Sequence, residues 1–223
     1  MNYTPINLND QTRPHPEPDI ADPYHPVPNP LLVVVSGPSG AGKDMTLKRM
    51  KELGYPFHFV VTTTDRPPRA GEVNGVDYFF VSTQEFERMV QAGELLEHAI
   101  VYGQHKGIAK TQVRQALASG QDVIMRLDVQ GAATIRKLAP AAVLIFLSCQ
   151  SEAELAARLR ARGTESQIAL DARLEVATQE MKRLPEFDYL VINRDHHLND
   201  TVQTVAAIIA AEKCRTRLRR ISL

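Results

Sequence analysis

Tryptophan is absent from this chain of 223 residues, which has only two cysteines and balances 26 basic side chains with 26 acidic ones. Cys149 and Cys214 form neither a CxxC motif nor a metal-ligand spacing, which favours a reducing, cytoplasmic setting. A net charge of zero argues against a partner nucleic acid or membrane surface. Purely apolar runs such as 31–35 span about five residues, too few for a membrane helix. No basic region followed by an apolar stretch opens the chain, so we expect no signal peptide.

Proline is concentrated at the start of the chain. Residues 1–30 hold 8 of the 14 prolines and no glycine, and they show no apolar periodicity. Such composition favours extended polyproline geometry without a core. We therefore predict a disordered or loosely attached arm over 1–30 and a folded domain over 31–223.

From residue 31 onward, short apolar strands alternate with helical segments, a pattern typical of an α/β fold with a parallel sheet flanked by helices. Residues 63–77 show no helical period and predict a loop. The predicted strands are 31–36, 57–62, 78–81, 95–102, 122–127, 142–147 and 188–192. The predicted helices are 43–53, one beginning at 82, 109–119, 130–138, 151–162, 168–183 and 199–220.

The segment 37–43 reads G-P-S-G-A-G-K, directly after an apolar strand and before a helix. It satisfies the phosphate-binding G-x-x-x-x-G-K pattern in the context that the pattern requires. The glycines let backbone N–H groups point at phosphate oxygens, and Lys43 can reach the β- and γ-phosphates of a nucleoside triphosphate. A glycine-rich turn with an incidental lysine is the alternative. The predicted ATP-binding residues of this loop are Gly37, Pro38, Ser39, Gly40, Ala41, Gly42 and Lys43.

Asp44 departs from the usual pattern, in which Ser or Thr follows the lysine and binds Mg²⁺. A carboxylate can also bind Mg²⁺ and is favourable in the first turn of a helix, although it places negative charge near the phosphates. We therefore predict Asp44 as an ATP-binding residue and metal ligand, with Mg²⁺ as the cofactor.

A second motif, R-x-P-R-x-G-E-x-x-G-x-x-Y, spans residues 66–78. Arg66 and Arg69 flank two prolines that stiffen the loop, so their guanidinium groups are placed to bind a phosphate dianion. A surface loop with solvated charges is the alternative. Together with the phosphate-binding loop, this motif makes residues 31 to about 193 resemble the guanylate kinase family.

The resemblance implies an α/β core of the P-loop NTPase type, with a small GMP-binding insertion at 63–107 and a helical lid at 158–170. It also implies in-line transfer of the ATP γ-phosphate to GMP, giving GDP and ADP, and a role in GMP recycling and guanine nucleotide supply. Both small-molecule substrates, ATP and GMP, would bind in one cleft.

The resemblance also assigns roles to single residues. Thr62 would contact the guanine O6, Glu97 and Asp128 would bind the guanine ring, and Glu72 would lie near the phosphate. The remaining GMP contacts would be Arg66, Arg69, Tyr78 and Lys106, the last at a position where the family commonly has Tyr. Asn193 would contact adenine, and the catalytic residues would be Lys43, Arg158, Arg162 and Arg173.

Arg126 is a further departure, because the family usually has Asp at this position. The side chain could pair with Asp44, bind a substrate phosphate or form an ordinary structural salt bridge. Since both departures concern charge near the expected metal, we hypothesise that Asp44 and Arg126 represent a charge exchange.

Two other functions remain open. Ribose 1,5-bisphosphate kinases of the same fold resemble this chain in having Asp after the lysine, but they lack the motif at 66–78. Guanylate-kinase-like modules that bind phosphopeptides without catalysis typically have degraded phosphate-binding loops. The sequence predicts a monomer or small homo-oligomer and leaves acceptance of dGMP open.

Overall fold

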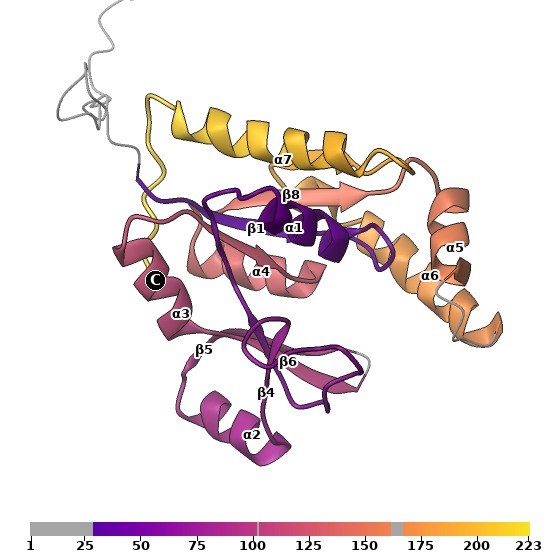
Figure 1. Ribbon diagram of the computed structural model, residues 1–223, viewed down its shortest axis with the longest axis horizontal. Helices are drawn as coiled ribbons and strands as arrows, with labels where there is room; N and C mark the ends of the chain where they lie inside the picture. The colour runs from indigo at the N-terminus through magenta and orange to yellow at the C-terminus, as the bar shows by residue number, and fades with distance from the viewer. Residues whose placement is uncertain (1–28, 102, 162–166) are drawn as a thin grey trace, which may run out of the picture.

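The computed structural model describes residues 29–101, 103–161 and 167–223 (Figure 1). Nearly all of the predicted arm lies outside this range, as does the part of the predicted lid that contains Arg162. In the described part of the chain, no helix has the length and apolar character needed to cross a bilayer.

The main sheet has five parallel strands in the order β2-β7-β1-β8-β9, which confirms the prediction of a parallel α/β core. Every residue of the central strand β1 and of its neighbour β8 is buried, as expected for strands covered on both faces. The strands are β1 (Leu32–Ser36), β2 (His58–Phe59), β7 (Val123–Arg126), β8 (Val143–Ser148) and β9 (Tyr189–Ile192).

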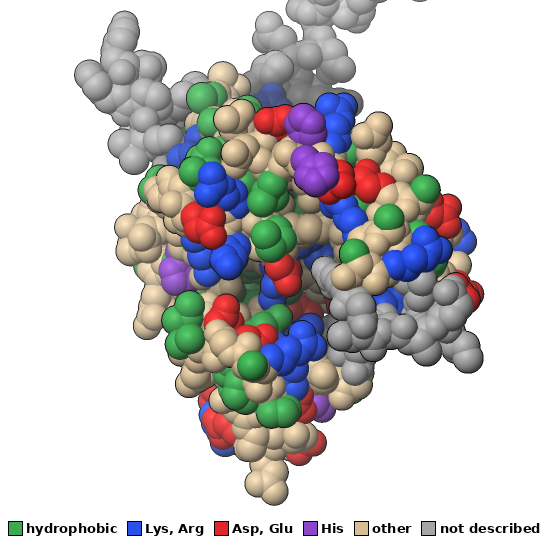
Figure 2. All heavy atoms as spheres, turned by 45° about the vertical axis from the view of Figure 1, so that its right-hand side comes forward, with side chains coloured by type: hydrophobic (Ala, Val, Ile, Leu, Met, Phe, Trp, Pro, Cys, Tyr) green, Lys and Arg blue, Asp and Glu red, His purple; other side chains and the backbone are tan. Residues whose placement is uncertain are grey.

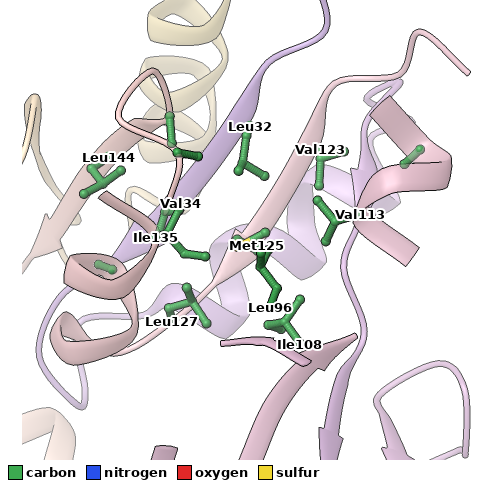
Figure 3. Packing of buried hydrophobic residues seen from close by; sticks show 14 residues of the cluster. Leu32, Val34, Leu96, Ile108, Val113, Val123, Met125, Leu127, Ile135 and Leu144 are labelled. Atoms are coloured by element: carbon green, nitrogen blue, oxygen red, sulfur yellow. The ribbon is translucent and has the colours of Figure 1, made fainter. Parts of the chain in front are cut away.

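Helices cover both faces of this sheet (Figure 1). On one face, α1 (Lys43–Glu52) and α7 (Leu198–Lys213) pack together and against the side chains of alternate β1 residues. On the other face, α3 (Lys110–Ala118) and α4 (Val129–Leu138) enclose Leu32 and Val34 (Figure 3). The helices α5 (Glu152–Ala161) and α6 (Gln167–Met181) contact each other beyond the sheet, and a short 3₁₀ helix (Leu184–Glu186) precedes β9.

A second sheet, ordered β4-β3-β6-β5, lies below the first in Figure 1 with α2 (Thr83–Gln91) packed against it. Its strands are β3 (Thr62–Thr64), β4 (Tyr78–Phe80), β5 (Leu95–Val101) and β6 (Gln104–Ala109). Leu96 of β5 and Ile108 of β6 join the same core cluster, below Met125 of β7 in Figure 3. The second sheet is therefore packed directly against the main domain.

The predicted strand 57–62 is confirmed only in part, because the chain leaves β2 after Phe59 and enters the second sheet at Thr62, so one predicted strand is two short ones in different sheets. No strand was predicted over β6, whose sequence Gln-His-Lys-Gly-Ile-Ala lacks alternation. Gly107 fits there because a Cβ would lie 2.8 Å from Leu95 Cδ1.

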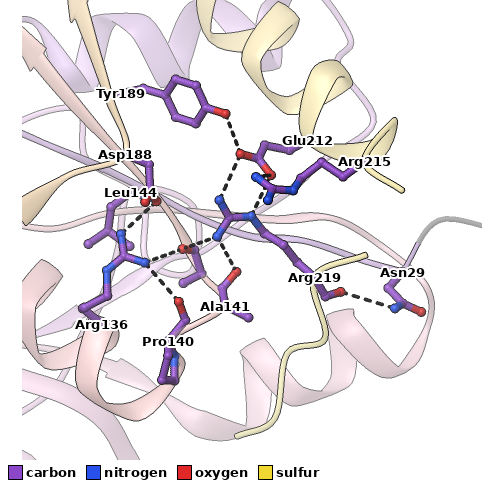
Figure 4. A network of polar contacts seen from close by, with 11 residues as sticks. Asn29, Arg136, Pro140, Ala141, Leu144, Asp188, Tyr189, Glu212, Arg215 and Arg219 are labelled. Atoms are coloured by element: carbon purple, nitrogen blue, oxygen red, sulfur yellow. Dashed lines mark hydrogen bonds and ion pairs between the residues drawn. The ribbon is translucent and has the colours of Figure 1, made fainter. Parts of the chain in front are cut away.

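The last predicted helix ends at Lys213 instead of residue 220, and the chain then folds back across the domain (Figure 4). Arg219 forms an ion pair with Glu212, a carboxylate that is 1% exposed, and donates to the carbonyls of Ala141 and Ala142. The hydrogen bonds from Arg219 lower the pKa of Glu212 to about 2. Arg219 therefore stabilises the folded tail that follows α7.

Candidate functional site

A cleft of about 820 Å³ opens at the carboxyl ends of β1 and β7, between the two sheets. In Figure 2, basic and acidic side chains surround a hollow between the upper and lower parts of the molecule. Ligands of open α/β sheets bind at this edge. The predicted site residues that line the cleft are Gly37, Ser39, Gly40, Gly42, Lys43, Asp44, Thr62, Arg69, Tyr78, Glu97, Lys106, Asp128 and Arg173.

The phosphate-binding loop follows β1 and leads into the first turn of α1. Gly37 has φ +130°, and a Cβ there would lie 2.0 Å from the Leu147 carbonyl oxygen, so only glycine fits. The amine of Lys43 donates to the carbonyls of Gly37 and Pro38. Burial lowers the pKa of Lys43 to about 8. Pro38 and Ala41 are buried and do not line the cleft, so they contribute to the loop through their backbone.

Asn193 lies underneath this loop instead of lining the cleft. Its Nδ2 donates to the Ala41 carbonyl at 2.8 Å, and its Oδ1 accepts a hydrogen bond from Thr201 at 3.0 Å. A Cβ on Gly42 would lie 2.2 Å from the same Nδ2, so the amide also limits that position to glycine. In this structure Asn193, expected as an adenine contact, positions the backbone of the phosphate-binding loop.

Replacing Asn193 by alanine should lower the free energy of unfolding by about 1–3 kcal/mol, because it leaves the buried Ala41 carbonyl without its donor. It should also raise the KM for ATP more than the KM for GMP, since the disturbed loop binds the donor phosphates. Urea denaturation and steady-state kinetics measure both effects. Asn199→Ala, which removes an exposed hydrogen bond to Arg49, is the matched control. Equal KM changes for both substrates would contradict this role.

Glu180 is a cleft residue that the sequence did not indicate. It comes from α6, and its carboxylate faces Lys43 and accepts a hydrogen bond from the backbone N–H of Ser39. Burial raises its pKa, and its Oε2 is buried with no hydrogen-bond partner among the described residues. An acidic residue within a helix carries no local signal for this position, because the contact joins residues far apart in the chain.

Two carboxylates lie at the end of the cleft nearest α4. Asp128 caps α4 by accepting the N–H groups of Gln130 and Gly131 at 2.9 and 2.8 Å. Glu97 on β5 is 5% exposed, and a Cβ on Gly131 would lie 2.9 Å from its Oε1. Burial, and then the nearby Asp128, raise the pKa of Glu97 to about 7. A buried carboxylate, with its two acceptor oxygens, matches the paired N–H donors of guanine.

Arg66 and Glu72 do not line the cleft in this structure. Both Arg66 Nη atoms donate to Glu72 at 2.6 Å, and the backbone N–H of Arg69 donates to the same carboxylate at 2.7 Å. The hydrogen bonds from Arg66 lower the pKa of Glu72 to about 2. Arg66 also lies over the ring of Tyr78, 4.7 Å from its centroid. Glu72 thus fixes the loop from which Arg69 faces the cleft.

Arg126 does pair with Asp44, one of the alternatives left open above. The distance from its Nη1 to Asp44 Oδ1 is 2.6 Å, and its Nη2 donates to the Tyr78 hydroxyl at 2.8 Å. One guanidinium therefore connects α1 of the main domain with β4 of the second sheet.

The three predicted lid arginines differ in position. Arg173 lines the cleft, whereas Arg158 donates to Glu154 and to the Asn193 carbonyl and does not line it. Arg162 lies outside the described residues.

Comparisons with known proteins agree with the cleft geometry. The family model described as Guanylate kinase matches residues 29–212. The Oryza sativa subsp. japonica protein named Guanylate kinase 2, chloroplastic/mitochondrial is 45% identical over 204 residues, 91% of this chain and 72% of that protein. The Guanylate kinase of Clostridioides difficile (strain 630) is 39% identical over 183 residues, 82% of this chain and 88% of that protein.

A solved structure gives the same result. The crystal structure of guanylate kinase from Anaplasma phagocytophilum has a TM-score of 0.70 and 26% sequence identity, covering 85% of this chain and 90% of that one. The family model spans most of the chain, and both curated relatives match it over most of its length. The chain therefore belongs to the guanylate kinase family.

Proposed function

We propose that the chain transfers the γ-phosphate of ATP to GMP, giving GDP and ADP. One observation carries this proposal: the glycine-rich loop with Lys43 and the buried carboxylate of Glu97 line the same cleft. The first is suited to a nucleoside triphosphate and the second to a guanine ring. A phosphoryl acceptor held by its base at one end of the cleft would present its phosphate to the donor at the other.

In this mechanism the GMP phosphate oxygen is the nucleophile. No general base is needed, because that phosphate is already mostly ionised at neutral pH. Lys43 and Arg173, which both line the cleft, neutralise charge that develops on the transferred phosphoryl group. The family resemblance adds Arg158 and Arg162, which would contribute when the lid closes. The protein contributes alignment and charge stabilisation, which phosphoryl transfer mainly requires.

The family implies a divalent metal, and we propose Mg²⁺ held by Asp44. In the described ranges 29–101, 103–161 and 167–223, no three His, Cys, Asp or Glu side chains are grouped to hold a metal by themselves. Mg²⁺ that is bound mainly through substrate phosphates needs only one or two carboxylates. Asp44 supplies one carboxylate in the cleft beside Lys43, so the site fits, and this carboxylate would leave its ion pair with Arg126 to hold Mg²⁺. When bound, the ion would neutralise phosphate charge and align the β- and γ-phosphates.

We also propose that the insertion at 63–107 and the lid at 158–170 close over the substrates and exclude water. The 31–223 domain boundary, the cytoplasmic location, the absence of nucleic-acid and membrane partners and the oligomeric state stay predictions.

The function is tested by measuring ADP production from ATP and Mg²⁺ with GMP, AMP, ribose 1,5-bisphosphate or no acceptor. We expect rapid turnover with GMP, little with AMP and none above background with the sugar phosphate. A dGMP arm measures tolerance of the missing ribose hydroxyl. Turnover with ribose 1,5-bisphosphate alone would replace the proposed substrate. Tight GMP binding in calorimetry without turnover would instead indicate a binding module.

A further inference from the structure

The strand register places Arg126 beside the phosphate-binding loop. Arg126 is the last residue of β7, and it pairs in register with Val35, two residues before Gly37. Its side chain is 25% exposed and lines the cleft. The guanidinium therefore lies at the junction between the donor loop and the second sheet.

Arg126 is also the cation bonded to the hydroxyl of Tyr78. Its Nη2 donates to this oxygen at 2.8 Å, whereas Arg66 faces the Tyr78 ring and donates to Glu72. A phosphate that contacts the Tyr78 hydroxyl would therefore meet Arg126 directly. Arg69 and Lys106 line the same cleft and add to its positive charge.

We propose that Arg126 binds the phosphate of the acceptor nucleotide beside the Tyr78 hydroxyl, and that Asp44 holds the guanidinium in place while the acceptor site is empty. This inference rests on the proposed function, because it takes GMP as the acceptor.

Exchange of Asp44 for a phosphate is energetically favourable on the contacts seen here. Asp44 is 67% exposed, so its ion pair with Arg126 is screened by water and weak. A phosphate near pH 7 carries up to two negative charges and can accept two parallel guanidinium hydrogen bonds. Arg126 is less exposed than its partner and also donates to the Tyr78 hydroxyl, so this second contact remains to orient the guanidinium when Asp44 is displaced.

Calorimetry without ATP or metal tests the proposal, with GMP and guanosine as ligands. Guanosine has the same base and ribose but no phosphate, so the ratio of the two affinities reports the phosphate contact alone. Arg126→Gln should weaken GMP binding about 10- to 100-fold, the value of one charge-assisted contact, and change guanosine binding less than about twofold. Arg126→Lys keeps the charge but loses the second donor direction, so its affinity for GMP should lie between those of the wild type and Arg126→Gln.

Two further variants sharpen the test. Asp44→Asn should tighten GMP binding, since it removes the carboxylate that competes for Arg126. Arg88→Gln breaks exposed ion pairs on α2 away from the cleft and should leave both affinities unchanged.

Retained guanosine binding shows that each variant is folded. Equal losses for GMP and guanosine, or no loss of GMP binding in Arg126→Gln, would overturn the inference, as would weaker GMP binding in Asp44→Asn. AMP is titrated into the wild-type protein in parallel, and GMP binding no tighter than AMP binding would contradict the proposed function instead.

Discussion

Replacing Lys43 by alanine should lower kcat for GMP phosphorylation by about 10²- to 10³-fold, with a smaller change in the KM for GMP. The amine lies in the glycine-rich loop, where it donates to the Gly37 and Pro38 carbonyls while the loop is empty. With ATP bound, the same donors would turn to the phosphates, and their effect would be largest where charge develops during transfer. Steady-state kinetics with saturating ATP and Mg²⁺ measure the loss.

Lys48→Ala is the matched control, because Lys48 is an exposed lysine on the same helix and does not line the cleft. Its kcat should stay within about twofold of the wild type, as expected for a surface substitution. A Lys43→Ala enzyme that kept more than about a tenth of the wild-type kcat would remove Lys43 from the catalytic role that its position indicates.

The low pKa of Lys43 gives this prediction a second, independent readout. Burial lowers that pKa to about 8 in the empty cleft, so much of the amine is neutral at pH 8.5. The phosphates of ATP favour the charged form and raise the pKa again. Wild-type protein should therefore take up protons on binding ATP at pH 8.5, measured by calorimetry in buffers of different ionisation enthalpy. This uptake should disappear in Lys43→Ala and shrink at pH 6.5, where the amine is already charged.

The sequence predicts the parts of this site whose residues are close together along the chain better than the parts whose residues are far apart. The phosphate-binding loop is seven consecutive residues between a strand and a helix, so local pattern was sufficient, and all of them except Pro38 and Ala41 line the cleft. Glu97 and Asp128 come from different elements, and their meeting depends on how β5 packs against α4. Only the family resemblance indicated them as a pair.

Other features depended on packing that no local pattern records. Asn193 supports the loop across 152 positions of sequence, and Glu180 reaches the cleft from the far end of α6. The last helix ends at Lys213 although the apolar and basic pattern continues. The segment after it packs against the domain because Arg219 forms an ion pair with buried Glu212. The ion pair of Asp44 with Arg126 was one of several alternatives, and it is seen only in the structure, where β7 lies in register beside β1.

Replacing Glu97 by glutamine should lower kcat/KM for GMP by about 10³-fold. A carboxylate accepts from both N1–H and N2–H₂ of guanine, whereas the amide presents one acceptor and one donor, and that donor faces a donor of the base. The site is buried, so the mismatched groups cannot be satisfied by water. Glu94→Gln, at an exposed carboxylate just before β5, is the control and should leave kcat/KM near the wild-type value.

The raised pKa of Glu97 predicts how guanine recognition depends on pH. Because burial and Asp128 raise that pKa to about 7, the carboxylate is largely neutral at pH 6 and charged at pH 8. Guanosine, which carries no phosphate to titrate, should bind wild-type protein more tightly as the pH rises, by up to about tenfold per unit below pH 7. Binding to Glu97→Gln should be weak and independent of pH, and a flat wild-type profile would contradict this assignment.

As the pH rises, the contribution of Glu97 to the free energy of unfolding should fall while the affinity for guanosine increases. A carboxyl group whose folded pKa lies above its ordinary value of 4.5 takes up protons on folding between pH 4.5 and 7, so its contribution to stability falls as the pH rises through that range. Above pH 7 the folded protein bears the full cost of a charged, buried carboxylate, which glutamine does not impose. Thermal unfolding should therefore show Glu97→Gln gaining stability relative to the wild type between pH 5 and pH 8. A variant that is more stable yet fails to use GMP would separate recognition from folding, because the buried charge that binds guanine is the same charge that destabilises the empty site.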